Sequence, residues 1–229
     1  MTNALPLPAV AFVGKQNSGK TTLLVKLIAE LTARGVQVGT VKHHSHCGFE
    51  FDKEGKDSWR HTQAGSCYTV IAAPDQIASV QRVDENVDVP LELIIKKMAE
   101  TASAKLDVVL VEGYRQSGLP TIELFRAENP RDAERTLGAE DNPLVAVVTD
   151  IRRVEQEAAV FGGAGGAGAA ACASDTGGAG GAVGASGSGG GSDSGGSDSG
   201  GCEPLPTFGF EDIAALADFV QSAIIEPCQ

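Results

Sequence analysis

The sequence predicts an α/β fold in which a mostly parallel β-sheet carries helices on both faces. Apolar runs at residues 9–13 and, after Asp107, at residues 108–111 of the predicted strand 107–111 are typical of strands that are buried on both sides of such a sheet. Between these runs apolar residues recur at helical spacing, so that strands alternate with helices along the chain. With 229 residues and 42% apolar composition, the chain is long enough to bury a core.

The individual elements follow from local patterns. After the strand at 9–13, the leucines and the isoleucine of residues 21–34 share one helical face, and Arg34 with Gly35 marks the end of that helix. Similar patterns predict further strands at 36–41, 66–73, 107–111, 121–126 and 144–148, and further helices at 56–64, 90–102 and 210–225.

Charge and composition exclude several classes of protein. Eighteen basic and 30 acidic residues give a net charge of −12, which argues against a nucleic-acid partner bound by counterion release. No segment approaches the roughly 18 to 20 apolar residues of a membrane span. The five cysteines include no C-x-x-C pair, so free thiols in a reducing compartment are expected. We therefore expect a cytoplasmic protein that does not bind membranes.

A glycine-rich loop between the first strand and the first helix matches G-x-x-x-x-G-K-[ST] at every defined position. It consists of Gly14, Lys15, Gln16, Asn17, Ser18, Gly19, Lys20 and Thr21. Backbone N–H groups around residues 17–20 and the dipole of the following helix would surround a β-phosphate. Lys20 would bridge the β- and γ-phosphates, and the Thr21 hydroxyl would bind Mg²⁺. The loop predicts a P-loop NTPase fold with a nucleotide site.

The chain is expected to form one P-loop nucleotide-binding domain with a long insertion. Residues 1–161 would supply the nucleotide-binding part. Residues 162–201 contain 18 glycines among 40 positions, together with many Ala, Ser and Asp residues, and such a composition cannot bury a core. We interpret them as a disordered insertion. Residues 202–229 would complete the same domain with a C-terminal helix.

Two carboxylates follow predicted strands. Glu112 ends the strand at 107–111, where a carboxylate can coordinate Mg²⁺ or hydrogen-bond one of its waters. Asp150 follows the strand at 144–148 and is a candidate to accept hydrogen bonds from a guanine base, although the full asparagine-lysine-x-aspartate pattern is absent. The alternative for Glu112 is a simple solvated strand end, and the alternative for Asp150 is an ordinary strand-end cap.

The loop after the second predicted strand carries Lys42, His43, His44, His46 and Cys47. Lys42 and His43 are expected to contact substrate oxygens, either of phosphate or of a pterin. Zinc binding by the three histidines and Cys47 is an alternative, but ligands on a loop share no fixed face. A solvated loop is the remaining possibility.

A charged block between Asp52 and His61 surrounds a single glycine. Asp57 with Ser58 would cap the short helix there and face the P-loop. Asp57 is a catalytic candidate beside Lys20, because its carboxylate would hold a Mg²⁺-bound water or orient the attacking water. Lys56 and Arg60 are candidates to stabilise charge in the transition state. The alternative is again a solvated face.

These blocks together resemble the MobB family of molybdopterin-guanine dinucleotide biosynthesis proteins. The resemblance rests on residues 14–22, which add Thr22 to the nucleotide-binding loop, on 39–43, on Asp52 with 55–58 and 60–61, on 111–114 and on 148–150. It implies a GTP-binding adapter with weak GTPase activity, Mg²⁺ as cofactor and a homodimer. It also implies a MobA-like molybdopterin guanylyltransferase as partner, which joins GMP to molybdopterin, and it leaves open whether molybdopterin itself binds here.

Two other function classes stay open at this point. A small-molecule kinase would use the same loop, but Arg115 and Arg126 do not make a convincing lid. A metal-inserting chaperone GTPase is suggested by the histidines before Cys47. Whether the protein acts as an enzyme, beyond slow hydrolysis of GTP, is also left open.

Overall fold

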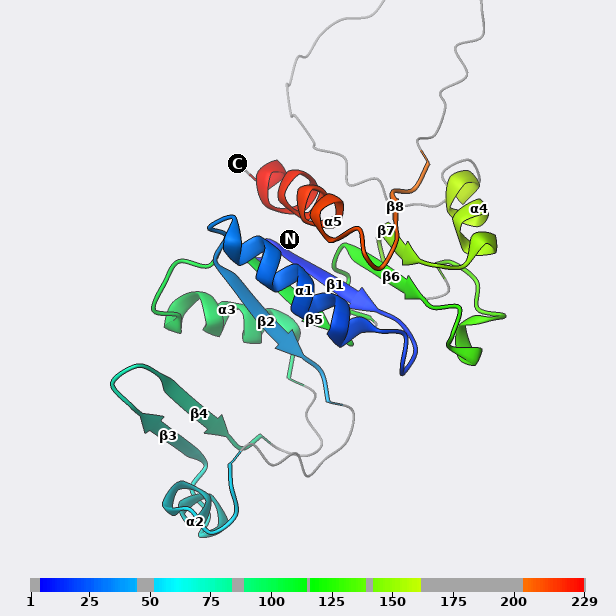
Figure 1. Ribbon diagram of the computed structural model, residues 1–229. Coiled ribbons are helices and arrows are strands. Elements are labelled where there is room, and N and C mark those ends of the chain that lie inside the picture. The colour runs from blue at the N-terminus through cyan, green and yellow to red at the C-terminus, as the bar shows by residue number, and fades with distance from the viewer. Residues whose placement is uncertain are drawn as a thin grey trace, which may run out of the picture.

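A computed structural model describes residues 5–44, 52–83, 89–114, 116–138, 142–161 and 204–228. Within these ranges the main sheet has six strands, and every neighbouring pair is parallel (Figure 1). The predicted α/β class is therefore confirmed. The spatial order of the strands is β2 (Val38–Lys42), β5 (Val108–Glu112), β1 (Ala9–Val13), β6 (Thr121–Phe125), β7 (Leu144–Thr149) and β8 (Thr207–Phe208).

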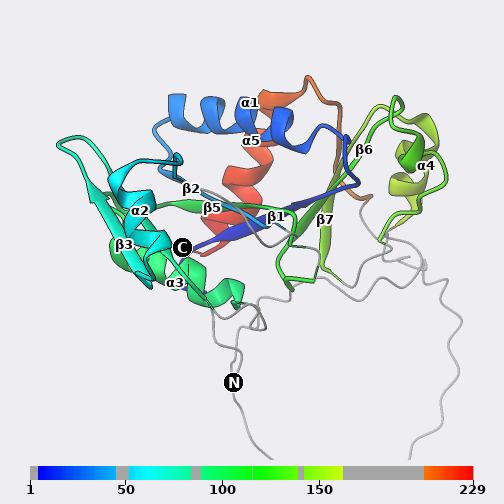
Figure 2. The same ribbon diagram turned by 90° about the horizontal axis from the view of Figure 1, so that it is seen from below.

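Helices cover both faces of the sheet. On one face α1 (Lys20–Ala33) and α5 (Ile213–Val220), which continues into η2 (Gln221–Ile225) and η3 (Glu226–Cys228), pack on alternate residues of β1, β5, β6 and β7. On the other face α3 (Leu91–Thr101) packs on β1, β2 and β5, and α4 (Arg152–Phe161) packs on β6 and β7. Figure 2 shows α1 and α3 on opposite sides of the sheet. This double cover explains why the central strands are apolar on both faces.

The strand predicted at residues 66–73 exists, but it does not join the parallel sheet. As β3 (Tyr68–Ala72) it pairs antiparallel with β4 (Ile77–Gln81), which the sequence analysis did not predict, and α2 (Asp57–Gln63) precedes this hairpin. Pro74 and Asp75 favour a turn between the strands, and Ala73 N donates to Gln76 O at 2.8 Å across that turn. A local turn, rather than a crossover, therefore decides how β3 pairs.

The hairpin contacts α2, where Thr62 Oγ1 lies 3.2 Å from Thr69 Oγ1 of β3, and it also contacts α3. Lys97 Nζ donates to Gln81 Oε1 at 2.9 Å and lies 4.9 Å from the centre of the Tyr68 ring. A hydrogen bond with the Ser79 side chain and the positive charge of Lys97 lower the pKa of Tyr68 below its ordinary value. Polar contacts thus hold the hairpin beside α3, and α2 contributes no buried residue.

Two further elements, α4 and β8, were not predicted from the sequence. The predicted insertion at 162–201 lies outside the described residues, and β8 follows it and pairs in parallel with β7. In the part of the chain that the structure describes, no helix is both long enough and apolar enough to cross a bilayer.

A buried polar cluster lies between β6 and β7, around η1 (Pro130–Asp132). Asp132 has no exposed surface and accepts from Arg126 N at 3.2 Å and from Asn129 Nδ2 at 2.8 Å. Arg135 Nη1 lies 3.4 Å from Asp132 Oδ1 and donates to Leu124 O at 3.0 Å. Arg135 Nη2 is 3.3 Å from Glu123 Oε1, and Glu123 is also buried. The cluster ties the connection after β6 to the sheet.

We predict that Asp132→Ala lowers the free energy of unfolding by about 3 kcal/mol, because the Arg135 guanidinium and two N–H groups would lose a buried acceptor. Chemical denaturation measures this loss. Asp218→Ala is the matched control, since Asp218 pairs with Arg34 while its side chain is 73% exposed; it should cost less than about 1 kcal/mol. Equal losses for the two variants would contradict the argument from burial.

Candidate functional site

The loop between β1 and α1 folds tightly around its own backbone. Asn17 and Gly19 have φ angles of 69° and 83°, in the left-handed region that glycine adopts easily and asparagine tolerates. A Cβ atom on Gly14 would lie 2.5 Å from Ser18 Oγ and 3.1 Å from Leu124 O. Any larger residue at position 14 would therefore push the loop away from β6.

Lys20 begins α1, and its side chain folds back over the loop. Its Nζ donates to Gly14 O at 2.9 Å and to Lys15 O at 2.7 Å. The ammonium group thus lies beside the N-terminus of α1, where the helix dipole adds positive potential. This arrangement favours an anion, which is the property required of a phosphate-binding loop.

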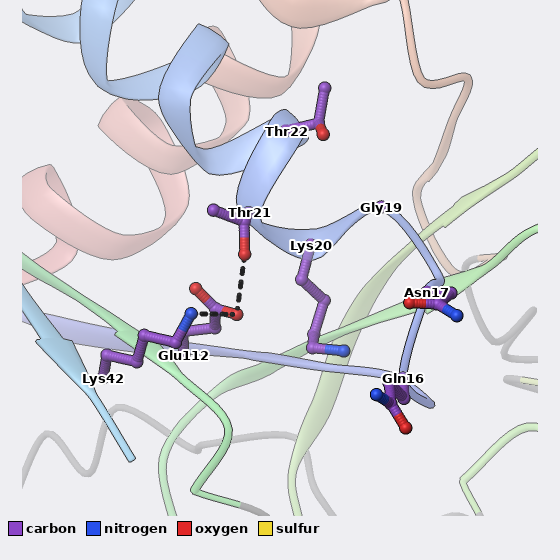
Figure 3. Close-up of a pocket in the computed structure, with 8 residues that line it drawn as sticks. All are labelled: Gln16, Asn17, Gly19, Lys20, Thr21, Thr22, Lys42 and Glu112. Atoms are coloured by element: carbon purple, nitrogen blue, oxygen red, sulfur yellow. Dashed lines mark hydrogen bonds and ion pairs between the residues drawn. The ribbon is translucent and has the colours of Figure 1, made fainter. Parts of the chain in front are cut away.

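Three charged or polar side chains from different elements meet at the mouth of the loop (Figure 3). Thr21 Oγ1, on α1, donates to Glu112 Oε1, at the end of β5, at 3.0 Å. Lys42 Nζ, at the end of β2, lies 3.5 Å from the same carboxylate oxygen. The Glu112 side chain is only 13% exposed, whereas that of Lys42 is 61% exposed. These residues line a pocket together with Gln16, Asn17, Gly19, Lys20 and Thr22.

The oxygen atoms at this mouth fit a hard divalent cation. A hydroxyl and a carboxylate are ligands that Mg²⁺ accepts beside phosphate oxygens and water. The Lys42 ammonium group, 3.5 Å from Glu112 Oε1, shows that a positive charge is stabilised at this place. Thr21 would hold Mg²⁺ directly, Glu112 would hold it directly or through water, and the metal would neutralise phosphate charge.

The residues of the charged block lie elsewhere. Asp57, Lys56 and Arg60 are exposed at or next to α2, which is apart from the P-loop in Figure 1, and none of them lines the pocket. The expected cap by Asp57 and Ser58 is wrong, because Lys56 occupies the N-cap position and no side chain bonds the helix end. The catalytic and substrate-binding roles of these three residues stay predictions, and their distance from the pocket does not support them.

His43 and Asp150 also lie outside the pocket lining. His43 N donates to Glu112 O at 2.9 Å, and its ring is 4.7 Å from the Tyr114 ring, so the residue extends the β2–β5 pairing. Asp150 is exposed, and its Oδ1 accepts from Ala127 N at 2.6 Å. The contact of His43 with substrate therefore stays a prediction, and so does the contact of Asp150 with guanine.

Zinc binding by the loop after β2 stays a hypothesis. His46 and Cys47 lie outside the described residues, as does Arg115. Among the residues that are described, no three His, Cys, Asp or Glu side chains gather into a group able to hold a metal ion.

A group of residues that no sequence pattern indicates contacts the P-loop from the other side. Asn129 Nδ2 donates to Gln16 O at 3.2 Å. A Cβ atom on Gly19 would lie 3.0 Å from Arg126 Nη1 and 3.3 Å from Phe210 Cε1. The Asn129-Pro130 dipeptide signals a turn, but no sequence pattern indicates that this turn lies against residue 16.

A parallel sheet, a phosphate loop between a buried strand and a helix, and a carboxylate at the end of the neighbouring strand together define a protein of the P-loop class. Comparison with known proteins adds the family. The chain belongs to the MobB family, because residues 9–150 match the model of molybdopterin guanine dinucleotide synthesis protein B.

Relatives agree with this assignment. A molybdopterin-guanine dinucleotide biosynthesis adapter protein of Haemophilus influenzae is 38% identical over 165 residues, which cover 69% of this chain and 88% of the relative. The protein of the same name from Escherichia coli is 34% identical over 152 residues, or 66% of this chain and 83% of the relative. The crystal structure of Bacillus subtilis MobB aligns with a TM-score of 0.57 at 20% identity, covering 95% of this chain and 98% of that one, which supports the fold.

We predict opposite effects of Glu112→Gln with and without metal. In the presence of Mg²⁺ the variant should bind nucleoside triphosphate roughly tenfold more weakly, because a charged group that holds the metal is lost. In EDTA it should bind the same nucleotide more tightly than wild type, because a carboxylate that repels the phosphates is gone. Calorimetry under both conditions measures the two affinities.

Glu157→Gln is the matched control, since Glu157 pairs with Arg153 on α4 and does not line the pocket. Its affinities should equal those of wild type in both buffers. A change of the same sign in both buffers for Glu112→Gln would argue against a metal-holding role.

Proposed function

We propose that this chain is a GTP-binding adapter with weak GTPase activity that supports the guanylylation of molybdopterin during molybdopterin-guanine dinucleotide biosynthesis. Membership of the MobB family and the names of the Haemophilus and Escherichia relatives support the place in cofactor biosynthesis. The nucleotide part rests on one observation, the contact of Thr21 with Glu112 at the mouth of the P-loop beside Lys20 and Lys42.

The local charge of the pocket supports a polyphosphate ligand despite the net charge of −12. Lys20 and Lys42 both line the pocket, and Glu112 is the single carboxylate among the eight lining residues of the described chain. Charges separated by more than about 8 Å in physiological salt are largely screened, so that distant carboxylates do not cancel this local field.

The residues that line the pocket also support slow hydrolysis. Fast hydrolysis of a nucleoside triphosphate needs a group that orients the attacking water, in addition to the metal and the loop lysine. Glu112 is already bonded to Thr21 and paired with Lys42. An adapter that holds GTP for another enzyme has no need of rapid turnover, which agrees with a pocket of this composition.

A homodimer and a MobA-like guanylyltransferase as partner belong to the same proposal. The β3–β4 hairpin supports protein–protein contact, because apolar side chains are exposed on it at Tyr68, Val70, Ile71 and Ile77. Ile77 is the most exposed of these four residues, at 76%.

Lys20→Ala should weaken the binding of Mg²⁺–GTP by at least about a hundredfold, because the loop loses the cation that contacts the phosphates. Lys26→Ala is the control on the same helix, since Lys26 pairs with the exposed Glu211 and does not line the pocket. Fluorescence titration with a labelled GTP analogue gives both affinities, and an unchanged melting temperature shows that the fold is intact.

Guanine preference is a separate expectation. Wild-type protein should bind Mg²⁺–GTP at least about tenfold more tightly than Mg²⁺–ATP, a difference of about 1.4 kcal/mol. Competition of each nucleotide against the same labelled analogue measures the ratio. Equal affinities would remove GTP from the proposal while leaving the phosphate site in place.

The adapter role is tested by in vitro guanylylation of molybdopterin. A purified MobA-like guanylyltransferase should form more product when wild-type protein is added than when Lys20→Ala is added. Stimulation of equal size by both proteins would show that the bound nucleotide plays no part in the adapter role.

A further inference from the structure

The side chain of Asn129 lies behind the P-loop, in the connection between β6 and β7. The residue is 6% exposed, and its Nδ2 donates to Gln16 O at 3.2 Å and to Asp132 Oδ2 at 2.8 Å. Its Oδ1 accepts from Arg131 N at 3.3 Å. The amide orientation is fixed by these partners, because the opposite orientation would place its oxygen against two acceptors.

The contact with Gln16 O determines which way one peptide group of the P-loop points. In a trans peptide the carbonyl oxygen and the following N–H point in opposite directions, and the described residues contain no cis peptide bond. Because Gln16 O is held towards Asn129, the N–H of Asn17 points the other way. Gln16 and Asn17 both line the pocket at the loop mouth.

This peptide needs to be held from outside the loop. Asn17 is the only residue other than glycine with a positive φ in the described chain, at 69°. A non-glycine residue in this region costs free energy and persists only when surrounding contacts fix it. Gln16 and Asn17 are themselves exposed, so that packing of their own side chains supplies little of that restraint.

We propose that Asn129 is a positioning residue that turns the Gln16–Asn17 peptide so that the Asn17 N–H faces the phosphates of a bound nucleotide. This inference rests on the proposed nucleotide site. Asn129 does not touch the nucleotide; it acts through the backbone of the loop.

The buried cluster behind Asn129 gives the positioning its rigidity. Asp132, with no exposed surface, bonds both Asn129 Nδ2 and Arg126 N, and Arg135 links Asp132 to the carbonyl of Leu124 in β6. Arg131 Nη1 adds a second contact from the same segment to the Gln16 side chain, at 3.2 Å. The chain of hydrogen bonds through Asn129, Asp132 and Arg135 therefore fixes the position of residue 16 relative to the sheet.

Asn129→Ala tests the inference in two measurements on the full chain. In ¹H–¹⁵N spectra of nucleotide-free protein, the Asn17 amide resonance should shift. In titrations with Mg²⁺–GTP and Mg²⁺–GDP, both affinities should fall by roughly tenfold, since both ligands carry the β-phosphate and one oriented donor is lost. Asn129→Asp, which keeps the volume but removes the Nδ2 donors, should weaken binding at least as much.

Asn142→Ala is the matched control. Asn142 Oδ1 accepts from the backbone N of Gly118 at 3.2 Å, before the amino ends of β7 and β6 and at the opposite edge of the sheet from the loop. It should change neither the Asn17 resonance nor the affinity.

The outcomes separate this inference from the proposed function. If wild type binds GTP and Asn129→Ala binds it equally well, with or without a lower melting temperature, Asn129 is merely structural and the inference is overturned while the function stands. An unshifted Asn17 resonance overturns it in the same way. If wild type binds no nucleotide, the proposed function fails and the inference fails with it.

Discussion

The register of three parallel strands is the constraint on which the candidate site depends. Phe12 of β1 pairs with Glu112 of β5, and Glu112 pairs with Lys42 of β2, so that these strands end level with one another where the P-loop begins. Side chains alternate between the two faces of a sheet, and a shift by one residue would turn Glu112 away from Thr21. Helices on both faces make such a shift costly, and packing far from the pocket thereby fixes a 3.0 Å contact within it.

The parts of the fold that were predictable are those whose causes are local. The buried strands, the phosphate loop and α1 each have a pattern that is complete within about a dozen residues, and Glu112 could be placed because a strand end leads to the same edge as the loop. The strand β3 was predicted, but its antiparallel partner β4 was not. The turn at Pro74 and Asp75 pairs β3 with β4 instead of with the parallel sheet. The role expected of Asp57 assumed that the charged block faces the P-loop from the end of the second strand, but α2 lies beside the hairpin, apart from the loop (Figure 1).

Other features could not be predicted from the sequence, because they depend on contacts between segments that are far apart in the chain. Asn129 and Gln16 are separated by 113 residues, and only the order of β1, β6 and β7 in the sheet brings them together. The same is true of Phe210, which follows residues 162–201 in the sequence and whose Cε1 would lie 3.3 Å from a Cβ atom on Gly19. Residues that shape a phosphate loop from behind carry no motif, because a hydrogen bond to a backbone carbonyl can come from many side chains.

The return of the C-terminal segment to the first helix has a consequence for synthesis of the chain. Arg34 near the end of α1 bonds Asp218 and the carbonyl of Ala214 on α5, and α5 covers the same apolar face as α1. On the ribosome, that face stays partly uncovered until α5 emerges, because α5 is translated after α1 and after the four strands that it covers. Nascent chains should therefore depend on chaperones for longer than the small size of the sheet would indicate.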